Sequence, residues 1–458
     1  MVVMPGREGC ALNLLGTTVL AMALMAGLLG LGSLLGRMLG VHRWGIPEAL
    51  LAGSLGLLIA PTGALPLLPP AVIRIWEPWP LILLTLVFAS LLLGKPLPSP
   101  GGLWRPLSAQ LLLALTLAFG QYLVASLAVL LVLGPLLHVS PVMACLIEVS
   151  YEGGHGSAAA LGPTYERLGV AGGQALGLAM ATVGLLSSTL IGGLLVLVGR
   201  ARGWLRGSGT AAQPALPTPT ADADGSWQPL LRRWLVNLAL AGCAVAIGWL
   251  LLALLQLLAR RLGGGFALVV DALPVFPLAL VGSLLVRWLL ERRGAAGLAC
   301  PRIQGRIGTL SADLLIVVAT ACLDLGLLAR DWVPLAVLAT TGLVWNLAVL
   351  LLLARRILPE PWFSRGILEF GQATGVAASG LLLLNLADPS DGGDALTPFS
   401  IKQLLLQPLL AGGVITVMAP LAIASWGLVA WSGLCLALTL LWIGLGLWLG
   451  RQSGLESA

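Results

Sequence analysis

The chain has 458 residues, of which 58% are hydrophobic and only 10% are charged. Soluble globular domains carry about 25% charged residues, so this composition excludes a soluble domain and indicates an integral membrane protein. The net charge of +6 is not typical of a nucleic-acid-binding protein, because the basic residues are strung between apolar segments and form no basic face. The six cysteines lie scattered in or beside apolar runs without a CxxC pair, which is typical of small core residues.

Apolar runs of about 20 residues, the length of a helix that crosses a bilayer, recur along the whole chain. The first half predicts helices over residues 13–36, 46–60, 81–93, 107–136 and 172–198. The loop between the second and third of these carries Pro69, Trp76 and Trp79, which fits a membrane interface. The second half predicts helices over 235–258, 273–290, 307–328, 333–353 and 401–425, and then an unmatched helix over 428–449.

The order of elements is the same in both halves, with a Gly-rich break before the last helix of each. The sequence therefore predicts an all-α polytopic membrane protein built from two repeats, over residues 10–199 and 231–425. A Pro-, Ser- and Thr-rich linker over 200–230 joins them, and an extra transmembrane helix and tail follow over 426–458. Because each repeat has five crossings, an odd number, the second must face the membrane in the opposite direction, as in many secondary transporters.

The distribution of basic residues predicts the orientation. A cytoplasmic linker places 19 of the 25 Lys and Arg residues, Lys402 among them, on the inside and six on the outside. This asymmetry predicts a multi-pass protein of the cell (inner) membrane with its N-terminus outside and its C-terminus in the cytoplasm. It also predicts that each Gly-rich break is a re-entrant loop, because a full crossing there would reverse every later loop.

The first break, over about 139–167, places charged side chains between two apolar runs. Its central polar and glycine residues include Glu148, Glu152, Gly153, Gly154, His155, Gly156 and Ser157. A lipid-facing span would not tolerate them, whereas a polar cavity would. The second break, over about 366–388, contains Gly371, Gln372, Thr374 and Gly375. On the predicted topology the two loops enter from opposite faces, so their tips meet near the middle of the membrane.

These residues suggest a site for an ion and a charged solute. Ser157 and Thr374 offer hydroxyl oxygens that can bind Na⁺ together with loop carbonyls. His155 is a candidate for binding a substrate carboxylate, carrying a proton or capping a broken helix. Glu148, Asp313 and Asn346 are further candidates for the site, although Asn346 could equally form an interhelical hydrogen bond. The glycines have the alternative role of letting helices pack closely.

The motif at residues 153–159, Gly-Gly-His-Gly-Ser-Ala-Ala, resembles the Gly-Gly-His-Gly-Thr-rich first re-entrant loop of the sodium/glutamate symporter family, with Ser157 in place of Thr. Residues 371–389 resemble the second loop of that family. The resemblance implies a homodimeric Na⁺-coupled importer of glutamate with two inverted five-helix repeats. By the same analogy, the first two helices of each repeat belong to a scaffold and the others to a mobile transport domain.

The predicted function is therefore Na⁺-coupled symport of glutamate, or a related small carboxylate, by alternating access. Na⁺ is the coupling ion and no other cofactor is expected. The alternatives are an H⁺-coupled or hydroxycarboxylate transporter of the same architecture, and a channel or non-transporting membrane scaffold. An enzyme is not expected, because the chain has no HExxH motif, intramembrane metal set or nucleophile–base pairing, and the absence of Walker motifs argues against ATP as the energy source.

Overall fold

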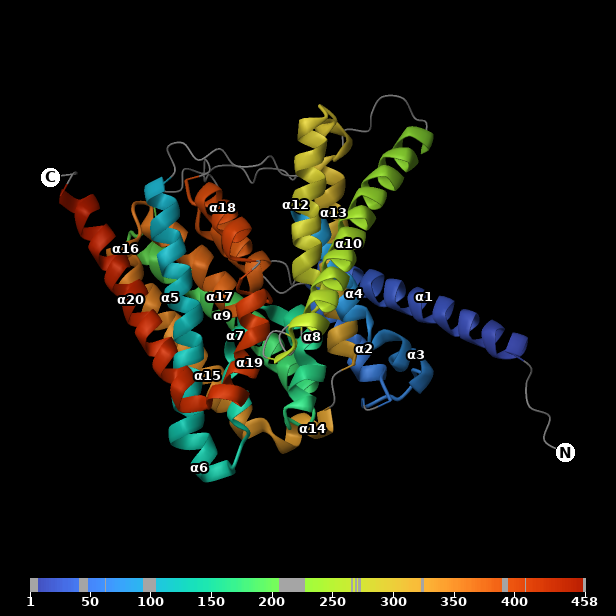
Figure 1. Cartoon of the computed structure of the whole chain (residues 1–458), viewed down its shortest axis with the longest axis horizontal. Helices are drawn as coiled ribbons and strands as arrows, with labels where there is room; N and C mark the ends of the chain where they lie inside the picture. The colour runs from blue at the N-terminus through green and yellow to red at the C-terminus, as the bar shows by residue number, and fades with distance from the viewer. Residues whose placement is uncertain are drawn as a thin grey trace.

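The computed structural model describes residues 7–40, 48–61, 63–93, 104–205, 227–264, 267, 270, 273–322, 325–388, 394–407 and 409–455. Within these ranges the regular structure is helical, and nine helical segments are long and apolar enough to cross a membrane (Figure 1). Their outward faces are apolar: Leu250, Leu254 and Leu257 of one span are each more than half exposed, at 60, 54 and 55%. Such faces are favourable in lipid and not in water, so the protein is a multi-pass membrane protein.

The first half contains the predicted helices with one addition. Its elements are α1 (Arg7–Leu39), α2 (Glu48–Ile59), α3 (Pro70–Trp76), α4 (Trp79–Leu91), α5 (Trp104–Ala128), a π-turn (Val129–Leu133), α6 (Gly134–Leu137) and α9 (Gly173–Ala201). Helix α3 occupies the predicted interfacial loop. Pro70 begins this helix, where its missing N–H costs nothing. Trp76 is buried and its indole Nε1 donates to the carbonyl of Ala21, 3.1 Å away, so this tryptophan holds α3 against α1.

The second half departs from the prediction at two helices. Its elements are α10 (Trp227–Leu262), α12 (Val275–Arg292), α13 (Pro301–Ala321), α14 (Leu325–Arg330), α15 (Trp332–Ala348), a π-turn (Val349–Ala354), α16 (Arg355–Ile357), α18 (Leu396–Leu406), α19 (Val414–Trp426) and α20 (Leu428–Leu455). The helix predicted over 307–328 is divided into α13 and α14. The helix predicted over 401–425 is divided into α18 and α19, because Ala411 and Gly412 have positive φ values of 55° and 98°, which an α-helix excludes.

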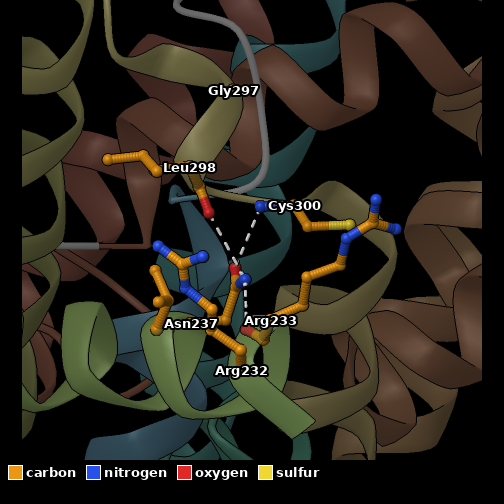
Figure 2. A pocket seen from close by; sticks show the side chains of 7 residues that line it. Arg232, Arg233, Asn237, Gly297, Leu298 and Cys300 are labelled. Carbon is orange, nitrogen blue, oxygen red and sulfur yellow. Dashed lines mark hydrogen bonds between the residues drawn. The ribbon is translucent and has the colours of Figure 1, made fainter. Parts of the chain in front are cut away.

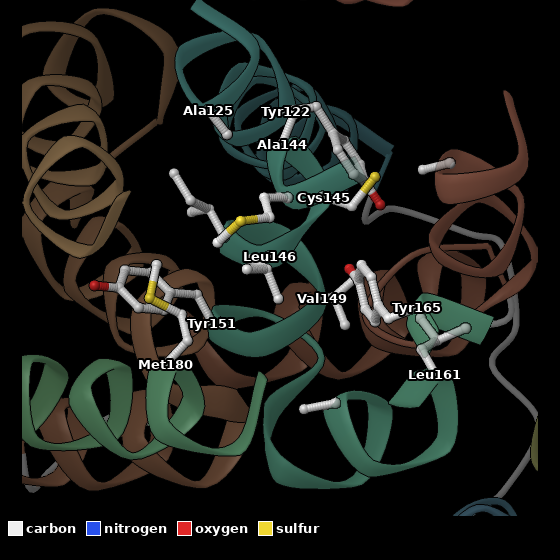
Figure 3. Close-up of a cluster of buried hydrophobic side chains, with 14 of the residues drawn as sticks. Tyr122, Ala125, Ala144, Cys145, Leu146, Val149, Tyr151, Leu161, Tyr165 and Met180 are labelled. Atoms are coloured by element: carbon white, nitrogen blue, oxygen red, sulfur yellow. The ribbon is translucent and has the colours of Figure 1, made fainter. Parts of the chain in front are cut away.

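Each Gly-rich break forms a helical hairpin. In the first, a 3-10 turn (Pro141–Cys145) and α7 (Leu146–Tyr151) lead to a turn at 152–153 and then to α8 (Gly154–Arg167). Val149 of α7 and Tyr165 of α8 belong to one buried cluster, and Figure 3 shows them facing each other. On a straight helix these two residues would be about 24 Å apart. The chain therefore reverses its direction between α7 and α8, and we name this unit the first hairpin.

The second hairpin is α17 (Trp362–Ala387), whose backbone is not helical at Gly375 and Val376. A Cβ added to Gly371 would lie 2.8 Å from the backbone nitrogen of Gly380. On a straight helix these two residues would be about 13.5 Å apart, so α17 consists of two legs packed against each other. By length α17 could cross a membrane, but the reversal means that it begins and ends on the same side of the bundle.

The two hairpins start from opposite ends of the bundle. The first follows α6, at the lower end in Figure 1, and the second follows α16, at the upper end. In the predicted scaffold, small residues bring α10 and α12 close together: a Cβ on Gly248 would lie 2.7 Å from the backbone of Ala279. Helix α4 also packs on this pair through Ala89, and Leu93, two residues beyond the end of α4, belongs to the same cluster.

Candidate functional site

The tips of the two hairpins touch. Gly154 begins the second leg of the first hairpin with φ of +67°, and a Cβ placed there would collide with Cγ1 of Val376. Val376 begins the second leg of the second hairpin with φ of 73° and ψ of 163°. Both backbone conformations are rare for residues other than glycine. Each leg that leaves this contact is a helix that begins there, so two helix N-termini face the same point.

The tips lie at mid-depth in the helix bundle. Gln121, near the middle of the 34-residue span Trp104–Leu137, bonds the second tip, and so does Asn346, near the middle of the span Trp332–Ile357. Gly184, in the central part of α9, is next to the carbonyl of Thr374 and the ring of Tyr151. Contacts with the middles of three long spans place the tips halfway between the two ends of the bundle.

The broken backbone of the second tip is capped by side chains. The carbonyl of Ala373 ends a helical leg and accepts hydrogen bonds from Nε2 of Gln121 at 2.6 Å and from Nδ2 of Asn346 at 3.0 Å. Nδ2 of Asn346 also lies 3.0 Å from Oγ1 of Thr374. These bonds satisfy backbone and hydroxyl groups that the helix end leaves without partners. The structure therefore brings two predicted site residues, Asn346 and Thr374, together at the tip.

Glu148 lies in the first leg of the first hairpin and is completely buried. Its Oε2 accepts a hydrogen bond from the hydroxyl of Tyr122, and its Oε1 accepts from Thr416 at 2.9 Å and from the backbone N–H of Ala411 at 3.1 Å. These donors come from α5, α19 and the interruption between α18 and α19. Glu148 thus ties the first hairpin to the interruption between α18 and α19.

The second hairpin contains a buried ion pair. Nζ of Lys402, on α18, is 2.7 Å from Oε2 of Glu369 and 3.0 Å from Oε1 of Gln372, which in turn donates to Gln403 at 2.8 Å. Lys402 is only 1% exposed. The count of basic residues assigned Lys402 to an inside segment, and in the structure its ammonium group is held within the bundle by Glu369. Lys402 and Gln403 were not among the site residues predicted from the sequence. The available signal was the presence of two strongly polar side chains at one end of an apolar run.

Several buried oxygen atoms near the tips have no hydrogen-bond partner among the described residues. They are Oε2 of Glu152, Oε1 of Glu369, Oε1 of Gln121 and Oγ of Ser157. Glu152, at the turn of the first hairpin, interacts electrostatically with Glu148, Lys402 and Glu369. Buried polar atoms normally have partners, so these oxygens favour a bound cation, proton or water.

A cation at these oxygens would need backbone and hydroxyl ligands as well as carboxylates. Within the described residues no group of three or more His, Cys, Asp or Glu side chains lies close enough to hold a metal ion. Ser157 lies beside the interruption of the α18–α19 segment, since a Cβ on Gly412 would collide with its Oγ. Hydroxyl and carbonyl oxygens of this kind are the ligands that suit Na⁺ in broken-helix sites.

His155 lies in the first turn of α8 and is 4% exposed. Its Nε2 is 3.0 Å from Oγ1 of Thr182 on α9, and that hydroxyl is also 3.0 Å from the carbonyl of Leu178. Both contacts are hydrogen bonds at the same time only when the hydroxyl donates to the carbonyl and Nε2 of His155 donates to the hydroxyl oxygen. This bond fixes the ring against α9 next to the tip.

The predicted glycines have three separate roles. Gly154 provides a positive φ at the tip, and Gly153 forms the joint between α7 and α8. Gly156 lies under the side chain of Leu84 of α4, and Gly371 is packed against the other leg of its own hairpin. A Cβ on Gly375 would lie 2.7 Å from Cβ of Ser188 of α9. Close packing, the alternative reading of the glycines, therefore accounts for the last three.

Asp313 lies apart from the hairpin tips. It is half-buried on α13, and its electrostatic neighbour is Glu48 at the start of α2. Asp324, which the sequence places on the same predicted helix face, lies outside the described residues, and so does most of the predicted linker, residues 206–226.

No protein-family model matches the chain, and no curated protein or solved structure matches it either. The likeness to the sodium/glutamate symporter family therefore rests on the motif residues alone, and the function has to be inferred from the geometry of the hairpin tips.

Proposed function

We propose that this protein is a secondary active transporter that carries a small carboxylate, glutamate first, together with Na⁺, across the cell membrane. The observation that carries the proposal is the contact between Gly154 and Val376, where two hairpins from opposite ends of the bundle meet. A plain helix bundle has no need for broken helices at mid-depth, whereas transporters build their sites from them.

The tips offer positive potential to an anion. The N–H groups in the first turns of α8 and of the second leg of α17 lack helical partners and face the contact, as helix N-termini do in anion sites. Val376 and Ala377 are half-buried and Ala378 is exposed, although they follow a tip that lies at mid-depth. This partial exposure supports a path by which a solute reaches the tips. A carboxylate of the substrate would bind the N–H groups there.

The carboxylates supply the site for the coupling ion. Glu148, Glu152 and Glu369 are buried, and among the described residues the ammonium group of Lys402 acts on Glu369 and Glu152. A bound cation offsets the excess negative charge and lowers the free energy of the anionic substrate beside it. The substrate and the cation then load together, and alternating exposure of the loaded tips to the two faces gives symport.

Proton coupling is the second candidate, and Glu152 favours it. Oε2 of this side chain is buried without a hydrogen-bond donor among the described residues. A carboxyl group in such a place can carry either a proton or a cation, whereas the hydrogen-bonded carboxylate of Glu148 is already occupied by three donors.

Uptake of radiolabelled glutamate into proteoliposomes tests both candidates. Three conditions are compared: an inward Na⁺ gradient, an inward proton gradient, and neither. Accumulation above equilibrium with the Na⁺ gradient alone supports Na⁺ symport, and accumulation with the proton gradient alone supports the second candidate. Equilibration without accumulation under every gradient would indicate a channel. Hydroxycarboxylates and other dicarboxylates added as unlabelled competitors identify the substrate class. No uptake of labelled glutamate, or of labelled forms of these competitors, would contradict the proposal.

A further inference from the structure

A pocket lies at the end of the bundle from which the second hairpin starts. Its residues are distant in sequence from those of both hairpin tips. Its volume is about 630 Å³, and it is lined by Arg232, Arg233, Val236, Asn237, Gly297, Leu298 and Cys300. The first four residues belong to the start of α10, and the others belong to the connection between α12 and α13. Figure 2 shows the two arginine side chains on either side of Asn237. The start of α10 and the α12–α13 connection therefore line one partly open, cationic pocket.

Asn237 forms the floor of the pocket and is fully used by the fold. Its Nδ2 donates to the carbonyls of Arg233 and Leu298, and its Oδ1 accepts from the N–H of Cys300 at 2.9 Å and from Gln304 at 3.1 Å. The asparagine therefore fixes the shape of the pocket. The pocket also presents the guanidinium groups of Arg232 and Arg233 to a ligand, and both side chains are exposed. Planar guanidinium groups match the oxygens of a phosphate.

The surroundings of the pocket are cationic and apolar at once. Arg292 lies 4.1 Å from the ring centre of Trp288, and both side chains are exposed at the end of α12. Arg293, Arg302 and Arg306 add further exposed positive charge on the same α12–α13 connection and the start of α13. Leu298, on the pocket wall, is 53% exposed. Arginines beside an exposed tryptophan and leucine at the end of a membrane span are typical of the headgroup region.

We propose that this pocket binds the phosphate group of an anionic phospholipid, with Arg232 and Arg233 as its ligands. A soluble phosphate would need only the guanidinium groups. A lipid also explains the apolar wall at Leu298 and the position of the pocket at the end of a span, where acyl chains lie beside the exposed leucines of α10. This site is independent of the hairpin tips and of the proposed transport function.

The test measures lipid binding to the full-length protein in a neutral detergent, by native mass spectrometry and by the shift of the melting temperature. The probes are phosphatidylglycerol, phosphatidylcholine and inorganic phosphate. We expect phosphatidylglycerol to bind and to raise the melting temperature, and the double variant Arg232→Gln, Arg233→Gln to bind it at least tenfold more weakly.

The matched control is Arg260→Gln, Arg261→Gln, which removes the same two charges from the opposite end of the same helix. We expect this control to bind phosphatidylglycerol as the unaltered protein does. Equal losses in both double variants would overturn the proposal, because they would reflect net charge only. Equal stabilisation by inorganic phosphate would also overturn it, in favour of a soluble anion, and so would equal binding of phosphatidylcholine.

Discussion

Gly154 and Val376 both hold positive φ values, and they touch each other at the tips of two hairpins that start from opposite ends of the bundle. For a β-branched residue such as Val376 this backbone region costs about 1–3 kcal/mol, and such strain is usually kept where function requires it. Each conformation directs a helical leg away from the contact. The strained residue, Val376, therefore lies where the two helix N-termini meet, whereas Gly154 adopts its positive φ without strain.

The contact at Gly154 should be more important for transport than for folding. We expect Gly154→Ala to lower the melting temperature and to abolish glutamate uptake, because alanine is disfavoured at φ of +67° by about 1–2 kcal/mol and its Cβ would collide with Val376. Gly169→Ala is the control, because Gly169 also has a positive φ, of +84°, but no atom lies within 4 Å of its Cβ position. Uptake lost equally in both variants would assign the effect to backbone strain and not to the contact between the tips.

Replacing Val376 should raise stability while it lowers transport activity. Glycine adopts φ of 73° and ψ of 163° without strain, and the valine side chain is only partly buried. We expect Val376→Gly to increase the free energy of unfolding by about 1 kcal/mol and to slow uptake, because the apolar contact that defines the tips is lost. Melting temperature and initial uptake rate are measured on the same preparation. A less stable variant would show that the side-chain contact outweighs the strain.

The buried ion pair of the second hairpin should be costly to break on one side only. Lys402→Met leaves the carboxylate of Glu369 buried without its 2.7 Å partner, and such a change typically costs about 3–5 kcal/mol. The double variant Lys402→Met, Glu369→Gln removes both charges, so we expect it to recover most of the lost stability. Melting temperatures of the single and double variants test this expectation. Additive losses would show that the two side chains do not act as a pair.

The two carboxylates of the first hairpin should respond differently to conversion into amides. Glu148→Gln places an NH₂ group opposite one of the donors Tyr122, Thr416 or Ala411, and an unmatched buried donor costs about 1–3 kcal/mol. Glu152→Gln alters an oxygen without a donor, so we expect the fold to be retained. Uptake by Glu152→Gln should no longer depend on the driving ion gradient. Normal ion dependence in Glu152→Gln would exclude this side chain from coupling.

Much of the fold is predictable from the sequence, because each span is a run of apolar residues and each hairpin is a run of glycines and polar residues. The break at Gly154 was predicted for that reason. The interruption between α18 and α19 was not, because Leu409 and Leu410 before Ala411, and Val414 and Ile415 after it, keep the segment apolar on both sides. Hydropathy alone does not predict backbone dihedral angles. The Gly412-Gly413 pair was the sequence signal for the interruption.

The candidate site was predictable only in part, since its partners are distant in sequence. Lys402 looks like a loop charge until Glu369, 33 positions earlier, is brought beside it. Asp313 looked like a site residue because it interrupts an apolar run, but α13 turns it toward α2. Side-chain pairing between residues distant in sequence depends on the packing of α5, α9 and α18, which no local pattern records.

Helix α9 supports both hairpins over little more than one turn. Gly184 faces Tyr151 of the first hairpin and Thr374 of the second, and four residues later Ser188 donates to the carbonyl of Gly371 at 3.0 Å. Neither tip can separate from the other without also losing contacts with α9. We therefore expect α9 and the two hairpins to move as one rigid body. Any surface along which this body slides must then lie elsewhere, for example where Gly156 of α8 packs against Leu84 of α4.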